Sequence, residues 1–250
     1  MTPFSTAFTR AVRFGLLTAV HLPDDPSPVS DAVLDRLPPD EQALARTLRG
    51  YKQVSFVGGR LALHQALGQL RMPTDPVLTG PQGQPLLPEG VAGSITHKRT
   101  LAVALVASSR HGDLGVDLED LAPEREGIAQ KVLRPEELAE IQALPPERRW
   151  TSTVLRFSLK EAVYKVLNPH LNRYIGFHEA RVVLDLDLSA HIELHLDPTE
   201  DQPTPPDHDF SLDGRYLWMG DKVLTMVRLR PDMHSGRPLN GPKGKLKGAT

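Results

Sequence analysis

The chain has 250 residues, of which 40% are hydrophobic and 24% charged, which is ordinary for a globular protein of one large domain or two smaller halves. No apolar run reaches the length of a membrane span, and a formal net charge of −2 gives no global reason to bind nucleic acid. The absence of cysteine excludes disulfides, thiolate catalysis and zinc fingers, and it leaves oxygen and imidazole as metal ligands, which favours a hard cation such as Mg²⁺.

The N-terminal part of the chain predicts a strand followed by helices. Residues 10–20 alternate loosely between apolar and polar side chains, which is typical of a strand. The apolar part of this stretch is short and no small-residue cleavage site follows it, so we expect a cytoplasmic protein. Pro38 and Pro39, followed by two acidic residues, predict a helix start, and apolar residues at helical spacing from Tyr51 onward predict a helix with one buried face.

The middle of the chain combines a long loop with strands and short helices. Residues 73–90 are rich in Pro, Gly and Gln and predict a loop. The apolar run 101–107 and the alternating stretch 114–119 predict two strands separated by a turn. Helical stretches are expected to begin at Pro123 and at Pro135, because each proline is followed by acidic residues.

The clearest helix pattern covers residues 146–167, where apolar side chains recur every three or four positions. Asn168 and Pro169 are expected to end this helix. Residues 180–187 and 190–197 alternate between apolar and polar side chains and predict a pair of strands. Strand and helix patterns in both parts of the chain therefore suggest two similar α+β halves.

The C-terminal part predicts a last hairpin and a tail. Residues 216–229 read as two strands with a turn at Gly220, and residues 198–208 as a surface loop. The final stretch, 231–250, is basic and rich in Gly and Pro, so we expect a mobile tail without core residues. Such a tail either attracts an acidic partner or only aids solubility.

Two carboxylates stand out in the sequence GVDLE at 115–119. On a strand, Asp117 and Glu119 point to one face, whereas Val116 and Leu118 point to the other. Two neighbouring oxygen ligands suit Mg²⁺, but a strand end that faces solvent has the same pattern. The motif alone leaves both interpretations open.

A second pair of charged residues lies on the long predicted helix, in the sequence FSLKEAVYK at 157–165. Glu161 and Lys165 are one turn apart and therefore share a face. The simplest interpretation is a surface ion pair, which contributes only about 0.3–0.5 kcal/mol.

Taken together, GVDLE at 115–119 and FSLKEAVYK at 157–165 resemble the paired signature of the Sfp-type 4'-phosphopantetheinyl transferases. The sequences FVGGRLA at 56–62 and GSITH at 93–97 resemble further blocks of this superfamily, the latter especially in the branch of enterobactin synthase component D. The resemblance covers roughly residues 50–180.

The resemblance implies an enzyme that moves the 4'-phosphopantetheine arm of coenzyme A (CoA) onto a serine of an apo acyl, aryl or peptidyl carrier protein and releases adenosine 3',5'-bisphosphate. The pathways implied are polyketide, nonribosomal peptide or siderophore biosynthesis. The family's fold is α+β, with two pseudo-symmetric subdomains in one monomeric chain and the active site between them. The expected division is a CoA-binding half at 1–109, a half with the Mg²⁺ and catalytic motifs at 110–230, and the tail.

The resemblance also implies roles for carboxylates. Asp117, Glu119 and Glu161 correspond to the Mg²⁺ ligands, and three carboxylates leave coordination places for water and phosphate oxygens. Glu137 corresponds best to the general base proposed for the family, with Glu136 as a neighbouring alternative. An acidic residue at this place can equally serve to stabilise a helix N-terminus.

Cations for the phosphates of CoA follow from the same resemblance. Lys165 is expected to act in catalysis by approaching the diphosphate, and His97 together with Lys52 or Arg60 is expected to bind the 3'-phosphate. Lys160 is either a further CoA ligand or a solvated charge beside its neighbouring glutamate. Gln84 stands where several relatives of this family have Lys or Arg, so the resemblance implies either that a cation on the adenine side is missing or that the contact is made through the backbone.

Two other classes of function share these features. A Mg²⁺-dependent nuclease or phosphodiesterase also needs carboxylates and lysine, although the net charge makes this class less attractive. A non-catalytic protein that binds CoA or a carrier would keep the same residues without turnover.

Overall fold

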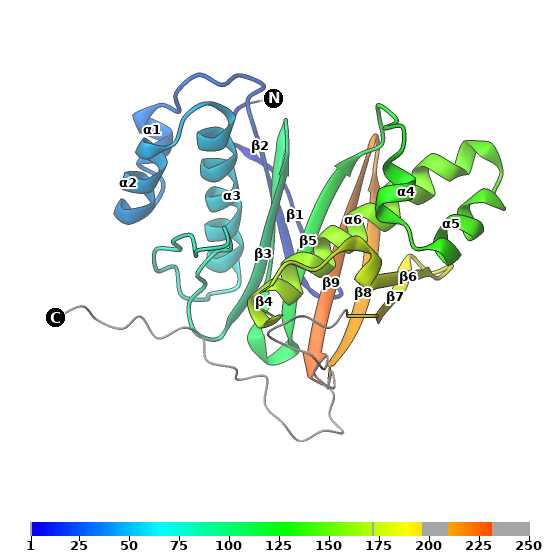
Figure 1. The fold of residues 1–250 in the computed structure, drawn as a ribbon. Helices are drawn as coiled ribbons and strands as arrows, with labels where there is room; N and C mark the ends of the chain where they lie inside the picture. The colour runs from blue at the N-terminus through cyan, green and yellow to red at the C-terminus, as the bar shows by residue number, and fades with distance from the viewer. Residues whose placement is uncertain (1, 172, 197–209, 232–250) are drawn as a thin grey trace.

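Two antiparallel sheets, each covered by one long helix, form the protein in the computed structural model, which describes residues 2–171, 173–196 and 210–231 (Figure 1). The first sheet has the order β1-β2-β4-β3 and consists of β1 (Thr6–Val12), β2 (Gly15–His21), β3 (Val91–Lys98) and β4 (Leu101–Ser108). The second has the order β5-β9-β8-β7-β6 and consists of β5 (Asp113–Asp120), β6 (Ala180–Leu184), β7 (Ser189–Leu194), β8 (Phe210–Met219) and β9 (Lys222–Pro231). The helices are α1 (Asp31–Leu34), α2 (Pro39–Thr47), α3 (Gly50–Gln69), α4 (Ile128–Val132), α5 (Pro135–Gln142) and α6 (Pro146–Leu171), with short 3₁₀ turns η1 (Ser109–His111) and η2 (Phe177–Glu179).

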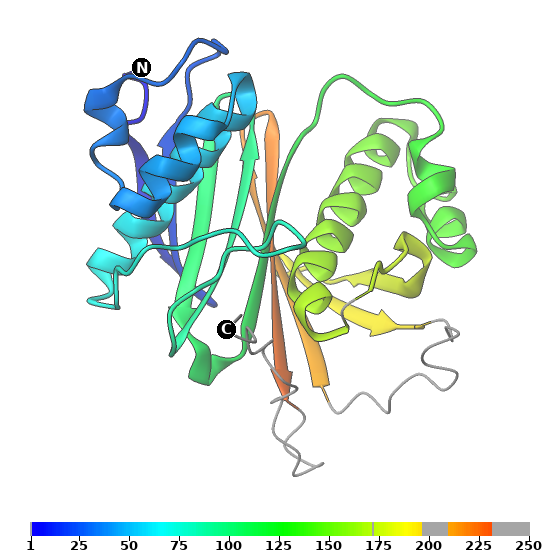
Figure 2. The same cartoon turned by 60° about the vertical axis from the view of Figure 1, so that its left-hand side comes forward.

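The layers follow the order helix, sheet, sheet, helix. Helix α3 packs on β2 and β4 of the first sheet, and α6 packs on β5 and β9 of the second. In the turned view, α3 and α6 lie on opposite sides of the two sheets (Figure 2). A third apolar core lies between the sheets and joins the two halves, since it takes side chains from β2 and β4 and from β5 and β9.

The position of strand β4 between α3 and the second sheet explains the continuous apolar run at residues 101–107. Ala102 and Ala104 face α3, whereas Val103 and Leu105 face the second sheet. The strand is therefore buried on both faces, and a strand of this kind has no polar positions.

Strand β5 has one apolar face and one face that carries Asp117 and Glu119. Val116 and Leu118 are fully buried in the core between the sheets, as the alternation predicts. The opposite face turns toward α6, and Gly115 lies directly beneath this helix. A β-carbon on Gly115 would come within 2.0 Å of the carbonyl oxygen of Ala162. The missing side chain thus lets α6 lie close to the strand that carries Asp117.

The predicted α+β class is confirmed, and most expected elements are present. Helix α2 begins at Pro39, α5 begins at Pro135, and β8 and β9 form a hairpin whose turn contains Gly220 at a positive φ of 65°. The connection between the two sheets runs through η1, at residues 109–111.

Three elements differ from the prediction. Residues 10–20 belong to two strands, because the hairpin turn contains Phe14, whose buried ring keeps the sequence apolar through the turn. Strand β3 was not predicted, because several of its residues are polar and give no apolar strand pattern. The strand lies beside β5 in the structure. Helix α6 continues through Pro169 to Leu171, which packs into the core of the second half.

One expected helix begins later in the chain than predicted, and two other expected segments lie outside the described residues. The helix expected at Pro123 begins only at Ile128. The surface loop at 198–208 and the tail after residue 231 lie outside the described residues. Within the described residues, no helix combines the length and apolar character that a membrane crossing requires.

The close approach at Gly115 gives a first prediction. We expect Gly115→Ala to lower the free energy of unfolding by about 3 kcal/mol, because the new β-carbon would overlap Ala162. Gly68→Ala is the matched control: nothing lies within 4 Å of a β-carbon there, and alanine should stabilise helix α3 by about 0.5–1 kcal/mol. Urea unfolding of both variants measures the difference. Equal stability of the two would contradict the account of how α6 packs on β5.

Candidate active site

The two carboxylates of β5 lie at the seam where the first sheet meets the second. Asp117 and Glu119 are each only 5% exposed. Strand β3 lies beside β5 here, and the Val116 backbone N–H donates to the Ser94 hydroxyl at 3.1 Å. Both halves of the protein therefore contribute to the surroundings of these carboxylates.

Asp117 is the point where three elements converge. Its Oδ1 accepts from the Lys165 ammonium of α6 at 2.8 Å and from the Thr96 hydroxyl of β3 at 3.2 Å. Its Oδ2 accepts from the Ser158 hydroxyl at 2.9 Å, and this hydroxyl is also 2.9 Å from that of Thr225 on β9. Lys165 additionally donates to the Val116 carbonyl at 2.9 Å. The ionised carboxylate is thus held in one orientation.

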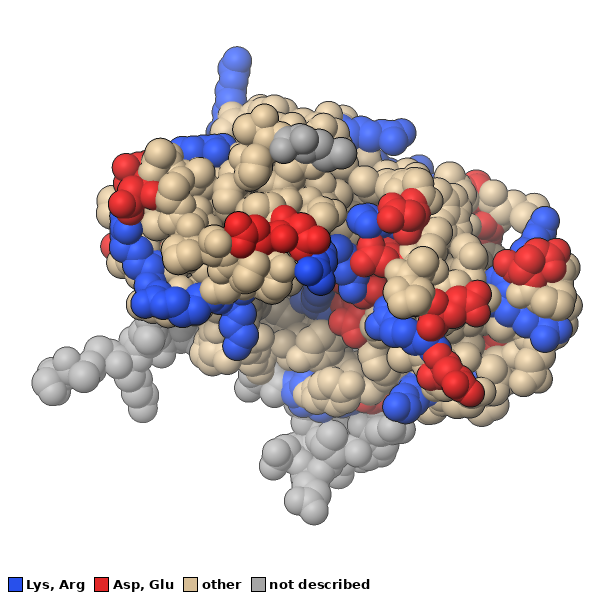
Figure 3. All heavy atoms as spheres, turned by 90° about the horizontal axis from the view of Figure 1, so that it is seen from above, with Lys and Arg blue, Asp and Glu red and all other residues tan. Residues whose placement is uncertain are grey.

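Glu119 has a cation on each of its two oxygens. Lys98 of β3 lies 2.8 Å from Oε1, and Arg125, from the segment before α4, lies 2.9 Å from Oε2. The Arg125 guanidinium also stacks over the Phe157 ring, 5.3 Å from its centroid. Seen from above, acidic and basic side chains lie next to one another over the middle of the molecule (Figure 3).

Glu161 completes the carboxylates on the helical side. Its burial and then the negative charge of Asp117 raise the pKa of this carboxyl, while Lys165 partly offsets the effect and Glu119 adds to it. The negative charges of Asp117 and Glu119 therefore act on Glu161. Among the described residues, His, Asp and Glu side chains nevertheless form no group of three already arranged around one point. As a donor set, three carboxylates with mutual repulsion, two of them nearly buried and Glu161 partly exposed, fit Mg²⁺.

The expected CoA ligands fall into two groups, of which the first lies at or near the surface. Lys165 and Asp117 are paired as described, and Lys52 is exposed in the first turns of α3. His97 is exposed near the end of β3, and its pKa is lowered by desolvation of the imidazole and then by the positive charges of Lys165 and Lys98. This lower pKa favours the neutral imidazole.

The second group is engaged inside the protein. Arg60 is buried, and its guanidinium donates to the carbonyls of Val77 at 2.8 Å and Leu78 at 3.3 Å. Glu41 accepts from the Val77 backbone N–H at 2.6 Å, so one loop residue is held from both sides. The hydrogen bonds from Arg60 hold residues 77–78 of the loop in place. Burial of the Arg60 guanidinium lowers its pKa.

Lys160 and Glu137 form a buried ion pair away from Asp117. Their side chains are 1% and 0% exposed, and the Lys160 ammonium lies 2.5 Å from the Glu137 carboxylate. Lys160 also donates to the Val132 carbonyl at 2.9 Å. Its ammonium is thus not a solvated charge, which corrects that interpretation of the sequence, and the ion pair with Glu137 already engages it.

Glu137 has the contacts of a helix N-terminal residue. One oxygen accepts from the Arg134 backbone N–H at 2.8 Å and the other from the Val182 backbone N–H at 2.7 Å. With no exposed surface and both oxygens engaged, this carboxylate is not placed to take a proton from a carrier serine. The alternative, Glu136, pairs with Arg134, which lowers its pKa and makes it a weaker base. The structure thus favours the helix-terminus role for Glu137.

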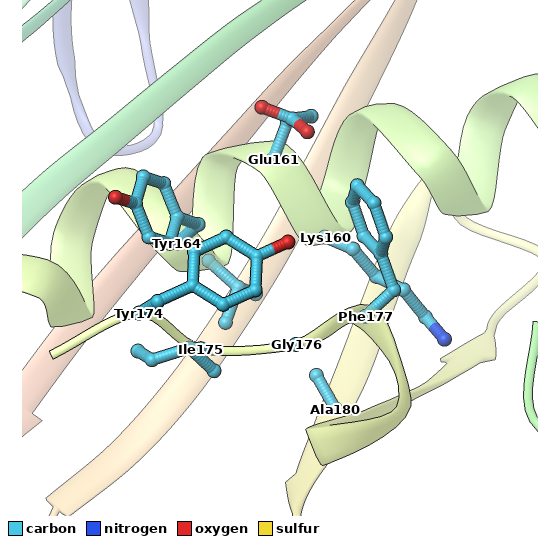
Figure 4. A pocket seen from close by; sticks show the side chains of 9 residues that line it. Lys160, Glu161, Tyr164, Tyr174, Ile175, Gly176, Phe177 and Ala180 are labelled. Atoms are coloured by element: carbon cyan, nitrogen blue, oxygen red, sulfur yellow. The ribbon is translucent and has the colours of Figure 1, made fainter. Parts of the chain in front are cut away.

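A small cavity lies beside Glu161, between α6 and the segment that leads to β6 (Figure 4). Its volume is about 160 Å³, and it is bordered by rings from Tyr164, Tyr174 and Phe177. The Tyr164 and Tyr174 rings pack with their centroids 5.7 Å apart. A cavity with aromatic walls, also lined by the charged side chains of Lys160 and Glu161, therefore lies beside one of the three carboxylates.

The sequence analysis did not single out four polar residues of this site: Thr96, Lys98, Arg125 and Ser158. Thr96 and Ser158 lie within or next to the motifs quoted above, so their position in these motifs was an available signal. Lys98 and Arg125 have no such signal, since their partner Glu119 is reached only through the packing of β3 and of the segment before α4.

Comparisons with known proteins agree with this geometry. Residues 40–107 match the 4'-phosphopantetheinyl transferase N-terminal domain, and residues 113–212 match the 4'-phosphopantetheinyl transferase superfamily. The chain is 33% identical to the 4'-phosphopantetheinyl transferase Npt of Nocardia iowensis, with 76% of this chain and 87% of that protein covered. It is 34% identical to Svp of Streptomyces mobaraensis, another 4'-phosphopantetheinyl transferase, with 91% and 89% covered. Enterobactin synthase component D of Salmonella typhimurium is 34% identical over 59% of this chain and 60% of its own length.

The chain therefore belongs to the 4'-phosphopantetheinyl transferase superfamily, as its sequence motifs indicate.

The buried pair of Glu137 and Lys160 gives a second prediction. Glu137→Gln should lower the free energy of unfolding by about 3–5 kcal/mol, because the Lys160 ammonium stays buried without a counter-charge. Lys160→Met should cost a similar amount by leaving the carboxylate unpaired. Glu136→Gln is the control, since its more exposed ion pair contributes at most about 1 kcal/mol.

Chemical unfolding and transfer activity are to be measured on the same preparations. A general base would give the opposite pattern for Glu137→Gln: unchanged stability and a loss of turnover of about 10²–10⁴.

Proposed function

We propose that this protein transfers the 4'-phosphopantetheine group of CoA to a serine hydroxyl of an apo carrier protein, giving the holo-carrier and adenosine 3',5'-bisphosphate. The convergence of Asp117, Glu119 and Glu161 with Lys165 at the seam of the two halves carries this proposal. Membership of the superfamily supports the reaction type. The first half would hold much of CoA, and the second half would supply the carboxylates.

Mg²⁺ is the metal that the three carboxylates would hold. Their oxygens are hard donors, Asp117 and Glu119 are nearly buried, and three carboxylates leave coordination places for other ligands. When bound, Mg²⁺ supplies positive charge next to the diphosphate, whose oxygens gain negative charge as the phosphorus–oxygen bonds change.

The protein's own side chains have distinct tasks in this proposal. Lys165 lies at the carboxylates with 28% of its side chain exposed, and its ammonium would hold the diphosphate in line for attack by the serine. His97 and Lys52, both exposed on the first half, would bind the 3'-phosphate. Binding a dianionic phosphate favours protonated His97, so the neutral imidazole would take up a proton as CoA binds.

The cavity beside Glu161 fits the remaining part of the substrate. Pantetheine is a flexible chain without charge, and the rings of Tyr164 and Phe177 would offer it a surface beside Glu161. Tyr174 has 68% of its surface exposed, so it would form the outer wall (Figure 4).

The choice of carrier is a narrower part of the proposal. We assign the protein to carriers of polyketide, nonribosomal peptide or siderophore synthesis, supported by its similarity to Svp and to enterobactin synthase component D. Its action as a monomer in the cytoplasm stays a prediction from the sequence.

The mass of an apo carrier protein tests this function. After incubation with CoA, Mg²⁺ and the protein, the carrier should gain the mass of one phosphopantetheine, and a chelator should abolish the gain. Glu161→Gln should reduce the rate by about 10²-fold or more while the free protein keeps its thermal stability, because the change removes a repelling charge. Glu147→Gln, an exposed substitution in the first turn of the same helix, is the control and should act as the wild type.

Near-normal transfer by Glu161→Gln would remove this residue from the metal site. No gain of mass on acyl, aryl and peptidyl carriers alike would contradict the transferase function.

A further inference from the structure

Lys98 and Arg125 occupy both oxygens of Glu119, one of the three proposed metal ligands. They come from different halves: Lys98 is on β3 and Arg125 is in the segment between β5 and α4. Each cation lies within 3 Å of a carboxylate oxygen, at 2.8 and 2.9 Å. A metal ion bound to either oxygen would have to share it with one of these cations, whose positive charge would repel the ion.

The formal charges of the site explain what these cations do. Asp117, Glu119 and Glu161 carry three negative charges, and Lys98, Arg125 and Lys165 carry three positive ones. The formal charges of the free protein are thus balanced at this site, whereas Mg²⁺ alone adds two uncompensated positive charges beside the nearly buried carboxylates of Asp117 and Glu119. The diphosphate of CoA carries two negative charges and restores the balance.

We propose that Lys98 and Arg125 replace the metal's charge at Glu119 in the free enzyme and move to the diphosphate of CoA when the metal binds. Metal and CoA then bind cooperatively, and the site discriminates against the metal alone. This inference rests on the proposed function and adds two diphosphate ligands that the family signature at 115–119 and 157–165 does not include.

The surroundings of both side chains allow such a movement. The Arg125 side chain is 45% exposed, and its other contact is the face of the Phe157 ring, which does not fix a guanidinium in one direction. The Lys98 side chain is 27% exposed, on a flexible four-carbon stem. Lys160, in contrast, is fully enclosed by Glu137 and the Val132 carbonyl and cannot take part.

Equilibrium binding to the full chain tests this proposal without any turnover. Titration calorimetry measures the affinity for Mg²⁺ alone and then at saturating adenosine 3',5'-bisphosphate or CoA, in the absence of a carrier. In Arg125→Gln and Lys98→Gln, Mg²⁺ alone should bind roughly two- to fivefold more tightly, because a competing ion pair is gone. The factor by which CoA tightens Mg²⁺ binding should fall by at least the same amount, and by reciprocity so should the effect of Mg²⁺ on CoA.

Lys222→Gln is the matched control. Lys222 pairs with Asp120, the residue next to Glu119, at 2.6 Å, and it should leave both affinities unchanged. Adenosine 3',5'-bisphosphate lacks the diphosphate, so it should couple to Mg²⁺ more weakly than CoA in the wild type.

The outcomes separate this inference from the proposed function. Unchanged or weaker Mg²⁺ binding by both variants, with wild-type coupling to CoA, would overturn the role of Lys98 and Arg125 and leave the metal site standing. No Mg²⁺ binding by the wild type, with or without CoA, would overturn both.

Discussion

Three carboxylates at the seam of two sheets, two of them almost fully buried, are the constraint on which the rest of this structure depends. Removing an ionised carboxylate from water is costly unless charges and hydrogen bonds compensate it. Compensation for Asp117 comes from Lys165 and Ser158 on α6 and from Thr96 on β3, and that for Glu119 from Lys98 and Arg125. These partners belong to both halves, so the site depends on the way the halves pack.

The apolar core between the sheets provides that packing. Leu105 of the first sheet and Val116 and Leu118 of the second are fully buried in it, and on β5 the carboxylates occupy the opposite face. Gly115 then brings α6 close enough for Ser158 and Lys165 to reach Asp117. A single alternating strand thus joins the core that unites the halves to the carboxylates of the proposed metal site.

Much of this could be predicted from local patterns, because those patterns reflect local geometry. Alternation on β5 predicts which face carries Asp117 and Glu119, and helical spacing places Glu161 and Lys165 on one face of α6. Such patterns were sufficient to predict the α+β class, and the sequence motifs were sufficient to predict the family.

What could not be predicted depends on partners that are distant in sequence. Lys160 is next to Glu161 in the motif but points about 100° away around the helix, where Glu137 of α5 meets it. The loop contact of Arg60 and the two cations on Glu119 likewise arise only when separate elements pack. Strand β3 escaped prediction for a related reason: its polar residues, such as Thr96, serve the site rather than the core.

The most direct test of the central claim is a crystal structure of the protein with CoA and Mn²⁺ in place of Mg²⁺, with the metal located by its anomalous scattering. The account predicts one ion bonded to oxygens of Asp117, Glu119 and Glu161 at about 2.1–2.2 Å and to the diphosphate of CoA. An ion bound elsewhere, or CoA bound with Glu161 turned away from the metal, would contradict it.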